Sequence, residues 1–241
     1  MRFATLIFLS CLLCSCQDDD DLVEITEQPD TTMTDSITYL ALGDSYTIGT
    51  AVDATERWPA LLAEHLRTAS GDPAQKNYEI TPDFIAVNGW TTTDLKGGIN
   101  RRMDLLTEYD LVSLLIGVNN QFQGGSASVY ATEFEELLNT ATTKAGNDPA
   151  NVFVVSIPDY AFTPSGGGNA TISEELDEFN AIATGIADRY GVDFLNITPI
   201  SREGLNDPGL VADDDLHPSG KQYRRWVEEV IEARVRTILM R

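Results

Sequence analysis

Residues 38–49 read T-Y-L-A-L-G-D-S-Y-T-I-G and predict a buried strand that ends in a tight turn. The apolar run at 39–42 stops at Gly43, and Asp44 and Ser45 follow at once. In open α/β sheets, ligands bind beyond the carboxyl ends of the strands, so Ser45 stands where chemistry is expected. A serine in a turn can equally cap the next helix. The rest of the chain decides between the two interpretations.

Strand and helix patterns alternate after this stretch. Further strands are predicted at 78–87, 111–116, 152–157 and 192–197, and helices at 60–68, 93–106, 173–190, 219–239 and after residue 126. The helix at 93–106 is expected to break near Gly97 and Gly98. Such alternation favours a parallel sheet with right-handed crossovers. We therefore predict a three-layer α/β/α domain.

The first 36 residues have a different composition. Arg2 precedes an apolar run at 3–13 that is too short to span a bilayer as a mature helix, which is typical of an export signal. All three cysteines lie here, and Leu13-Cys14-Ser15-Cys16 resembles a bacterial lipobox. We expect residues 1–16 to be a lipoprotein signal with Cys16 as lipid acceptor, although an ordinary secretory signal with incidental cysteines is the alternative. Residues 17–36 contain eight acidic and no basic residues and predict a disordered tether before a domain at 37–241.

These features predict a protein that is exported and lipid-anchored to the bacterial cell envelope, at the outer membrane. The acidic run behind Cys16 also resembles surface-export signals of Bacteroidetes lipoproteins. The net charge of −22 disfavours nucleic acid and anionic headgroups as partners, so any membrane contact is expected through the lipid anchor alone. No cysteine follows Cys16, which excludes disulfides and thiolate catalysis from the mature domain. The oligomeric state cannot be read from the sequence.

Polar residues cluster at three strand ends and before the last helix. Acyl transfer needs a nucleophile, a base, and a group that orients the base. Of the two histidines, His65 lies within a predicted helix, whereas His217 follows an irregular acidic loop and is the good candidate for the base. Asp214, three residues before His217, can fold back in a turn to hold one imidazole nitrogen while the other faces Ser45. Its neighbours Asp213 and Asp215 lack that spacing.

With these residues in place, the chain resembles the SGNH/GDSL family of esterases and lipases. The four blocks of the family occur in order as Gly43-Asp44-Ser45, Gly89, Gly117-Val118-Asn119 and Asp214-Asp215-Leu216-His217. The resemblance implies a five-stranded, flavodoxin-like parallel sheet. It also implies Ser45 as nucleophile, His217 as base, Asp214 as its orienting carboxylate, and an oxyanion hole from the backbone N–H groups of Ser45 and Gly89 and the side-chain amide of Asn119.

Two departures from familiar patterns stand out. The third block of the family usually continues with Asp, whereas position 120 is Asn here, which affects the expected geometry of the loop rather than the nucleophile. The chain also has no G-x-S-x-G elbow, which argues against the ordinary α/β-hydrolase fold.

The predicted function is hydrolysis of carboxylic esters through an acyl-Ser45 intermediate, without cofactor or metal. Short acyl or acetyl esters are the expected substrates, esters on carbohydrates among them, with contacts from the loops at 121–125 and 160–168. The main alternative is a surface lipoprotein that binds glycan or another ligand without turnover, because fold alone does not fix function. A metal-dependent hydrolase built on residues 213–217 is weaker, because a single histidine among carboxylates offers no recognisable second ligand group.

Overall fold

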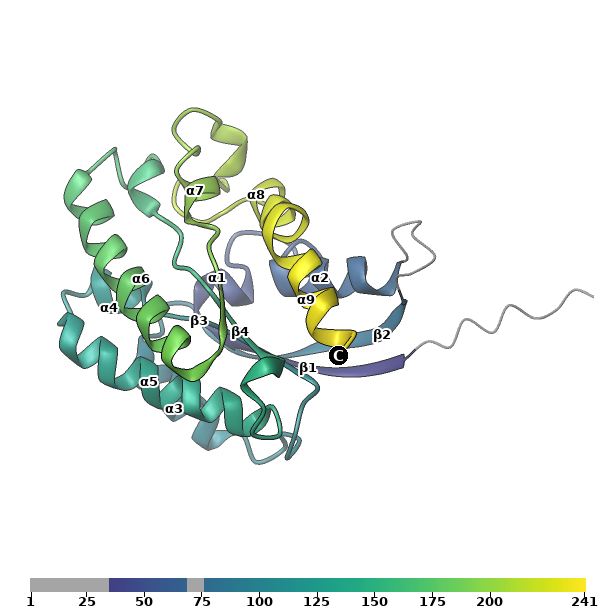
Figure 1. Ribbon diagram of the computed structural model, residues 1–241. Helices are drawn as coiled ribbons and strands as arrows, with labels where there is room; N and C mark the ends of the chain where they lie inside the picture. The colour runs from purple at the N-terminus through teal and green to yellow at the C-terminus, as the bar shows by residue number, and fades with distance from the viewer. Residues whose placement is uncertain (1–34, 69–75) are drawn as a thin grey trace, which may run out of the picture. The chain divides into compact units, whose positions relative to one another are not determined.

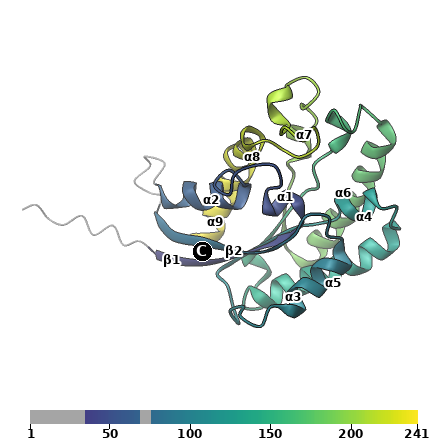
Figure 2. The ribbon, with the colours of Figure 1, turned by 180° about the vertical axis from the view of Figure 1, so that it is seen from behind.

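The computed structural model describes residues 35–68 and 76–241, which form a five-stranded parallel sheet between two layers of helices (Figures 1 and 2). The predicted signal segment and its Cys16, and nearly all of the predicted tether, lie outside these residues. The strand order is β2-β1-β3-β4-β5, and every neighbouring pair is parallel. The strands are β1 (Asp35–Gly43), β2 (Tyr78–Ala86), β3 (Leu111–Leu115), β4 (Val152–Val155) and β5 (Asp193–Leu195). This arrangement confirms the predicted three-layer, flavodoxin-like α/β/α fold.

Helices cover both faces of the sheet. One layer contains α2 (Trp58–Arg67), α8 (Gly220–Trp226), the π-helical turn η4 (Val227–Ile231) and α9 (Glu232–Leu239), and the other contains α3 (Thr92–Arg101), α5 (Ala127–Lys144) and α6 (Ala170–Tyr190). Short helices at the ends of strands are α1 (Ser45–Ile48), α4 (Val118–Phe122) and α7 (Thr198–Ser201). The 3₁₀ turns are η1 (Pro149–Asn151), η2 (Tyr160–Phe162) and η3 (Pro208–Leu210). The chain passes from β1 to β2 on one side of β1 and then to β3 on its other side, so the order reverses at β1 and β3.

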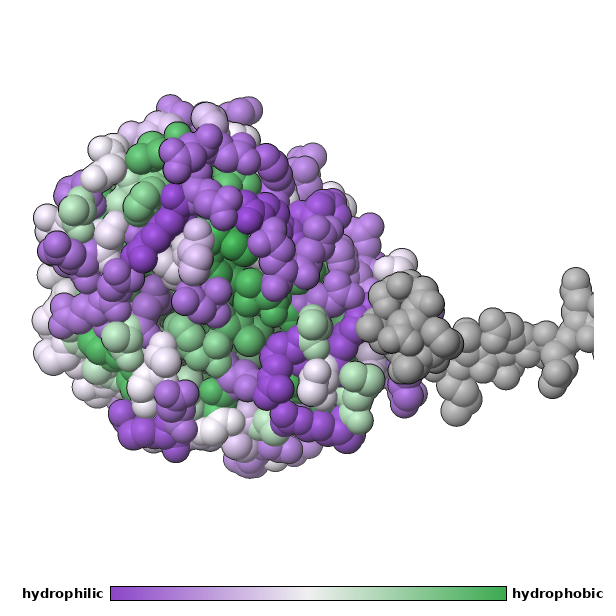
Figure 3. Space-filling view, turned by 45° about the horizontal axis from the view of Figure 1, so that its top comes forward, coloured by the Kyte–Doolittle hydropathy of each residue, from purple (hydrophilic) through white to green (hydrophobic). Residues whose placement is uncertain are grey.

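The core explains why these segments form these elements. Every residue of β3 is buried, as expected for a parallel strand covered on both faces. In α5 the buried residues are Tyr130, Phe134, Leu137, Leu138 and Ala141, a helical spacing that turns one stripe of the helix toward the sheet. Hydrophilic residues cover most of the face drawn in Figure 3, where hydrophobic residues show through in a central strip.

The helix α3 differs from the prediction. It runs unbroken through Gly97 and Gly98 and ends at Arg101 rather than near residue 106. A capping box between Thr91 and Asp94 starts the helix. A side chain at Gly98 would collide with the ring of Trp90, so this glycine permits close packing rather than breaking the helix.

No helix in the part of the chain described by the structure is both long and apolar enough to cross a membrane. The first strand takes in Asp35 and Ser36, the last two residues of the predicted tether.

Candidate active site

Ser45 lies directly beyond the carboxyl end of β1, at the first position of α1. Asp44 caps this short helix, because its Oδ1 accepts a hydrogen bond from the backbone N–H of Tyr46 at 3.0 Å. A side chain at Gly43 would collide with Thr47 and with the carbonyl oxygen of Leu115 on β3. Glycine is therefore required for β1 to turn sharply into α1, and this turn places Ser45 at the point where the strand order reverses.

The loop before α8 folds back on itself and pairs His217 with Asp214. Val211 and Pro218 form an isolated bridge, and the backbone N–H of Ala212 donates to the carbonyl of His217 at 2.8 Å. Within this turn, Asp214 Oδ2 lies 2.6 Å from His217 Nδ1, and Oδ1 accepts the backbone N–H of His217 at 2.9 Å. The carboxylate thus fixes both the backbone and the ring of the histidine.

The Asp214 carboxylate is held in its charged form. Partial burial on its own would raise its pKa, but hydrogen bonds from the backbone and the ring of His217 and from the backbone N–H of Leu216 outweigh burial. The pKa of Asp214 therefore lies below its ordinary value. A charged carboxylate at Nδ1 favours the tautomer with the proton on that nitrogen and leaves Nε2 free to accept one.

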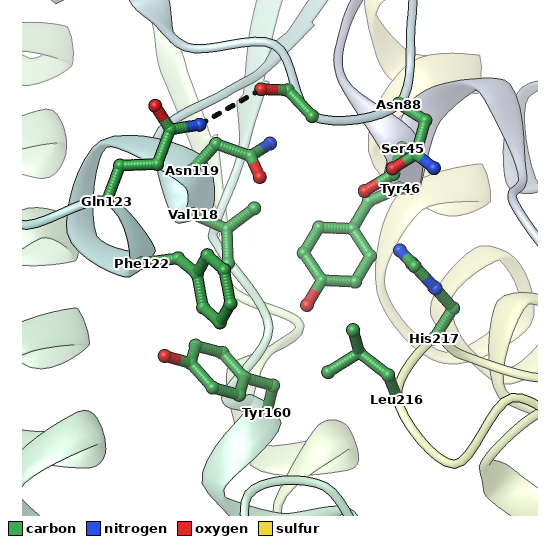
Figure 4. A pocket seen from close by; sticks show the side chains of 11 residues that line it. Ser45, Tyr46, Asn88, Val118, Asn119, Phe122, Gln123, Tyr160, Leu216 and His217 are labelled. Carbon is green, nitrogen blue, oxygen red and sulfur yellow. Dashed lines mark hydrogen bonds between the residues drawn. The ribbon is translucent and has the colours of Figure 1, made fainter.

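Gly89 and Asn119 come together from the ends of β2 and β3. Gly89 has φ of 82°, a left-handed conformation that favours glycine, although there is open space where a side chain would stand. Asn119 Nδ2 donates to the carbonyl of Trp90 at 2.9 Å. Gln123 Nε2 donates to the carbonyl of Gly89 at 3.3 Å, the bond drawn in Figure 4. One hydrogen of the Asn119 amide is used in this bond, and the second remains available for a ligand.

These residues open onto one cavity of about 280 Å³ (Figure 4). Its polar lining comes from Ser45, Asn88, Gly89, Asn119, Gln123 and His217, and its apolar and aromatic lining from Tyr46, Val118, Phe122, Tyr160 and Leu216. Among the described residues, no hydrogen bond joins the Ser45 hydroxyl to His217. Catalytic hydrogen bonds are often long in a free enzyme and tighten when substrate binds. Every residue predicted for the acyl-transfer reaction except Asp214, which stands behind His217, lines this cavity.

The two predicted substrate loops reach the cavity only in part. Phe122 and Gln123 contribute from the first loop, and Tyr160 from the second. Gln121 instead lies beneath the cavity wall, where it accepts a hydrogen bond from the Tyr160 hydroxyl and donates to Glu175. The rings of Phe122 and Tyr160 meet edge to face with centroids 6.1 Å apart and form one wall.

Four residues that line the cavity were given no role in the prediction from sequence. Tyr46, Asn88, Val118 and Leu216 each stand directly beside a predicted site residue in the chain. Their position next to Ser45, Gly89, Asn119 and His217 in the chain was the signal that could have identified them. Tyr46 contacts His217 with ring centroids 5.7 Å apart in an edge-on arrangement, so it supports the imidazole as well as lining the cavity.

A metal centre finds no support in the arrangement of the acidic loop. Within residues 35–68 and 76–241, no group of three or more His, Cys, Asp or Glu side chains is placed to hold a metal ion.

A serine at a strand end that shares a cavity with a carboxylate-paired histidine and amide groups is an arrangement typical of serine hydrolases. The chain belongs to the GDSL-like lipase/acylhydrolase family, whose model matches residues 41–225. The predicted enzyme class, a serine hydrolase acting on ester bonds, is thereby confirmed.

Similar proteins act on different esters. An arylesterase from Vibrio mimicus is 25% identical over 199 residues, which cover 80% of this chain and 84% of that protein. A solved acetylxylan esterase from Geobacillus stearothermophilus matches with a TM-score of 0.62 at 16% identity, over 82% of this chain and 95% of the other. A phospholipase A1 from Streptomyces albidoflavus matches with a TM-score of 0.60 at 20% identity, over 80% of this chain and 98% of the other. The structural matches support the fold and leave the substrate open.

Proposed function

We propose that this enzyme hydrolyses small carboxylic esters through an acyl-Ser45 intermediate, with His217 as base and Asp214 as its orienting carboxylate. One observation carries the proposal: Ser45, His217, Gly89 and Asn119 come from four separate segments and line the same cavity. A binding protein needs no carboxylate behind a histidine that faces a serine. The ligand-binding alternative therefore has no observation of its own in its favour.

The first half of the reaction transfers the acyl group to Ser45. His217 Nε2 takes the hydroxyl proton as Ser45 Oγ attacks the ester carbonyl carbon, and the carbonyl electron pair moves onto oxygen. The backbone N–H groups of Ser45 and Gly89 and the Asn119 amide stabilise this oxyanion. When the tetrahedral intermediate collapses, the bond to the alcohol breaks and the alcohol leaves with the proton from His217.

The second half reverses these roles. Water attacks the acyl carbon and gives its proton to His217, and the same donors hold the second oxyanion. The bond to Ser45 Oγ then breaks, His217 returns the proton to the serine, and the carboxylic acid leaves. Asp214 stays ionised throughout and stabilises the imidazolium that forms twice in each cycle.

The cavity supports a small ester as substrate. Its volume of about 280 Å³ lies just below the roughly 300–1,000 Å³ found for small-molecule sites. In Figure 4, His217 lies on one side of Tyr46, Val118, Phe122 and Tyr160 lie on the other, and Leu216 lies below the ring. Because His217 protonates the leaving alcohol, the alcohol belongs on the first side and the acyl group on the second. An acetyl, short acyl or aromatic acyl group fits such walls, and a sugar is an acceptable alcohol.

The proposal is tested with the full-length protein and the p-nitrophenyl esters of acetate and butyrate. We expect turnover by the wild type and by Ser128→Ala, a control at an exposed serine of α5, and none by Ser45→Ala. Intact mass after a fluorophosphonate probe should show one adduct that is absent from Ser45→Ala. A folded wild type with neither turnover nor adduct would refute the proposal, and glycan binding would then be measured.

We also propose that the enzyme is exported and attached to the outer membrane by a lipid on Cys16. The apolar run at 3–13, the lipobox-like Leu13-Cys14-Ser15-Cys16 and the acidic segment behind it support this. Metabolic labelling with a palmitate analogue should mark the wild type and Cys14→Ala but not Cys16→Ala. Equal labelling of Cys16→Ala would show that Cys16 is not the acceptor.

A further inference from the structure

A chain of hydrogen bonds joins α4 to the segment that carries Gly89. Asn120 is buried and makes two bonds to Thr92: its Oδ1 accepts the backbone N–H of Thr92 at 3.0 Å, and its Nδ2 donates to the Thr92 hydroxyl at 2.7 Å. The Thr92 hydroxyl in turn lies 2.5 Å from Glu133 Oε2 on α5. Together, Asn120, Thr92 and Glu133 form the Asn120–Glu133 chain.

The direction of every bond in this chain is fixed by chemistry. A backbone N–H can only donate, so the Asn120 atom facing it is the oxygen and the other is the NH₂ group. The Thr92 hydroxyl therefore accepts from Asn120 and directs its single proton to Glu133. A carboxylate such as Glu133 can only accept, which completes the sequence of donors and acceptors.

Glu133 is held as a carboxylate from several sides. The Thr93 hydroxyl lies 2.8 Å from both of its oxygens, and Lys96 Nζ lies 3.0 Å from Oε1. Burial raises the pKa of Glu133, but the hydrogen bonds from Thr92, Lys96 and Thr93 outweigh it and leave the pKa below its ordinary value. The end of the chain is thus a fixed acceptor.

The Asn120–Glu133 chain lies directly behind the oxyanion donors. Thr92 stands three residues after Gly89, and Asn120 stands next to Asn119 in α4. The Asn119 side chain also bonds to the carbonyl of Trp90, between Gly89 and Thr92. We therefore expect a shift of Thr92 against Asn120 to change the separation between the Gly89 N–H and the Asn119 amide.

We propose that Asn120 and Glu133 are a matched pair of positioning residues that set the geometry of the oxyanion hole through Thr92. Neither touches the cavity, and both act through the segment between Gly89 and Thr92. The inference rests on the proposed function, because it assigns oxyanion binding to Gly89 and Asn119.

The test reverses the donor and acceptor roles in the hydrogen bonds of the Asn120–Glu133 chain. In Asn120→Asp, two carboxylates face one hydroxyl proton, so one oxygen of the new aspartate is left against an acceptor and the segment shifts. We expect kcat on p-nitrophenyl acetate to fall roughly 10–10²-fold with little change in KM, because the lost alignment acts on the transition state. In Asn120→Asp/Glu133→Gln, the amide of the introduced glutamine can donate to the Thr92 hydroxyl, which can then donate to the introduced aspartate. This double variant should recover most of the lost kcat.

A matched control distinguishes the effect of hydrogen-bond direction from the effect of removing one negative charge. Glu136 also pairs with Lys96, at 2.6 Å, but makes no hydrogen bond to Thr92. Asn120→Asp/Glu136→Gln removes the same negative charge without supplying a donor, so it should stay as slow as Asn120→Asp. Equal recovery from Glu136→Gln, or an Asn120→Asp variant with wild-type kcat, would overturn the inference.

Thermal unfolding of the same variants gives a readout independent of turnover. The melting temperature lost in Asn120→Asp should be largely regained with Glu133→Gln and not with Glu136→Gln. Additive shifts for Asn120→Asp and Glu133→Gln would show that the two residues are not paired and would also overturn the inference. A wild type without turnover would instead refute the proposed function, and unfolding would still decide the pairing.

Discussion

Both histidines of the chain pair with a carboxylate, but of the two only His217 lines the cavity that contains Ser45. His217 Nδ1 lies 2.6 Å from Asp214, and His65 Nδ1 lies 2.8 Å from Glu232. Nε2 of His65 lies 3.8 Å from Glu228 Oε1, so carboxylates flank both of its nitrogens. His217 instead shares a cavity with Ser45 (Figure 4). A histidine–carboxylate pair is therefore common to a structural contact and a candidate active site, and the groups around it make the difference.

The surroundings of His65 indicate a structural role. Arg236 is buried and donates to Glu232 Oε1 at 2.8 Å and to the backbone carbonyl of His65 at 2.5 Å. It also reaches the carbonyls of Thr68 and Lys76, so one guanidinium ties α9 to the end of α2 and to the segment before β2. The cluster of His65, Glu232 and Arg236 thus joins three segments of the chain.

The largest expected effect comes from exchanging each histidine for asparagine. His217→Asn removes the proposed base and should lower kcat on p-nitrophenyl acetate by roughly 10⁴–10⁶-fold. His65→Asn should leave kcat within about twofold, because its pair does not reach the cavity. Comparable losses in the two variants would mean that the proposed assignment of the base is wrong.

The two carboxylates, Asp214 and Glu232, should differ in their effect on kcat as the two histidines do, but by a smaller factor. In Asp214→Asn, the oxygen can still accept the backbone N–H of His217, which turns the amide NH₂ toward Nδ1. The proton then moves to Nε2, where it prevents the ring from taking the Ser45 proton, and kcat should fall roughly 10²–10⁴-fold. Glu232→Gln serves as the control and should retain wild-type turnover. A wild-type kcat in Asp214→Asn would mean that Asp214 does not orient the ring of His217.

The pH dependence of stability should have opposite signs for Asp44, beside Ser45, and for Glu232, beside His65. Burial raises the pKa of Asp44 to about 7, and its Oδ2 has no hydrogen-bond partner among the described residues. Around Glu232, burial is outweighed by hydrogen bonds from His65 and Arg236, and the pKa lies below its ordinary value. Asp44 therefore contributes stability at low pH that is lost as the pH rises toward 7, whereas Glu232 contributes stability at neutral pH that is lost on acidification.

Asp44→Asn tests this sign. The variant keeps a side-chain oxygen to cap Tyr46 and has no charge to bury. Its free energy of unfolding, relative to the wild type, should rise by up to about 1.4 kcal/mol for each pH unit between about 4 and 7. Urea denaturation of both proteins from about pH 4 to about pH 8 measures the difference. A difference that stays constant over this range would show that Asp44 is not neutral when buried at low pH.

The parts of the molecule that follow from local signals were predictable. The alternation of apolar runs and helical stripes predicted the sheet and its two helical layers. The polar residues after β1, β2 and β3 share one edge because parallel strands place their carboxyl ends together. The three-residue spacing of Asp214 and His217 is also local, and it separated Asp214 from its neighbours in the prediction.

Contacts between distant residues could not be predicted in this way. His65 and Glu232 are 167 positions apart, and Thr92 and Glu133 are 41 apart. The close packing that requires glycine at position 98 involves the ring of Trp90, which comes from the preceding loop. Sequence patterns report propensity and burial, whereas these pairings depend on how the layers pack against one another.

The smallest expected effect is on stability, where Glu232→Gln should cost more than Asp214→Asn, the opposite of their order for turnover. Glu232→Gln leaves the buried guanidinium of Arg236 without its carboxylate partner, whereas Asp214→Asn removes a charge from a side chain that is 34% exposed. Because the Glu232 side chain is itself 19% exposed, we expect a loss of about 1–2 kcal/mol rather than the full cost of breaking a buried ion pair. That loss lowers the melting temperature by roughly 2–8 °C in a protein of this size. Calorimetry of the two variants beside the wild type should show the larger decrease in Glu232→Gln, the variant that keeps its turnover. A larger decrease in Asp214→Asn would mean that the active-site loop, and not the cluster around His65, holds the fold together.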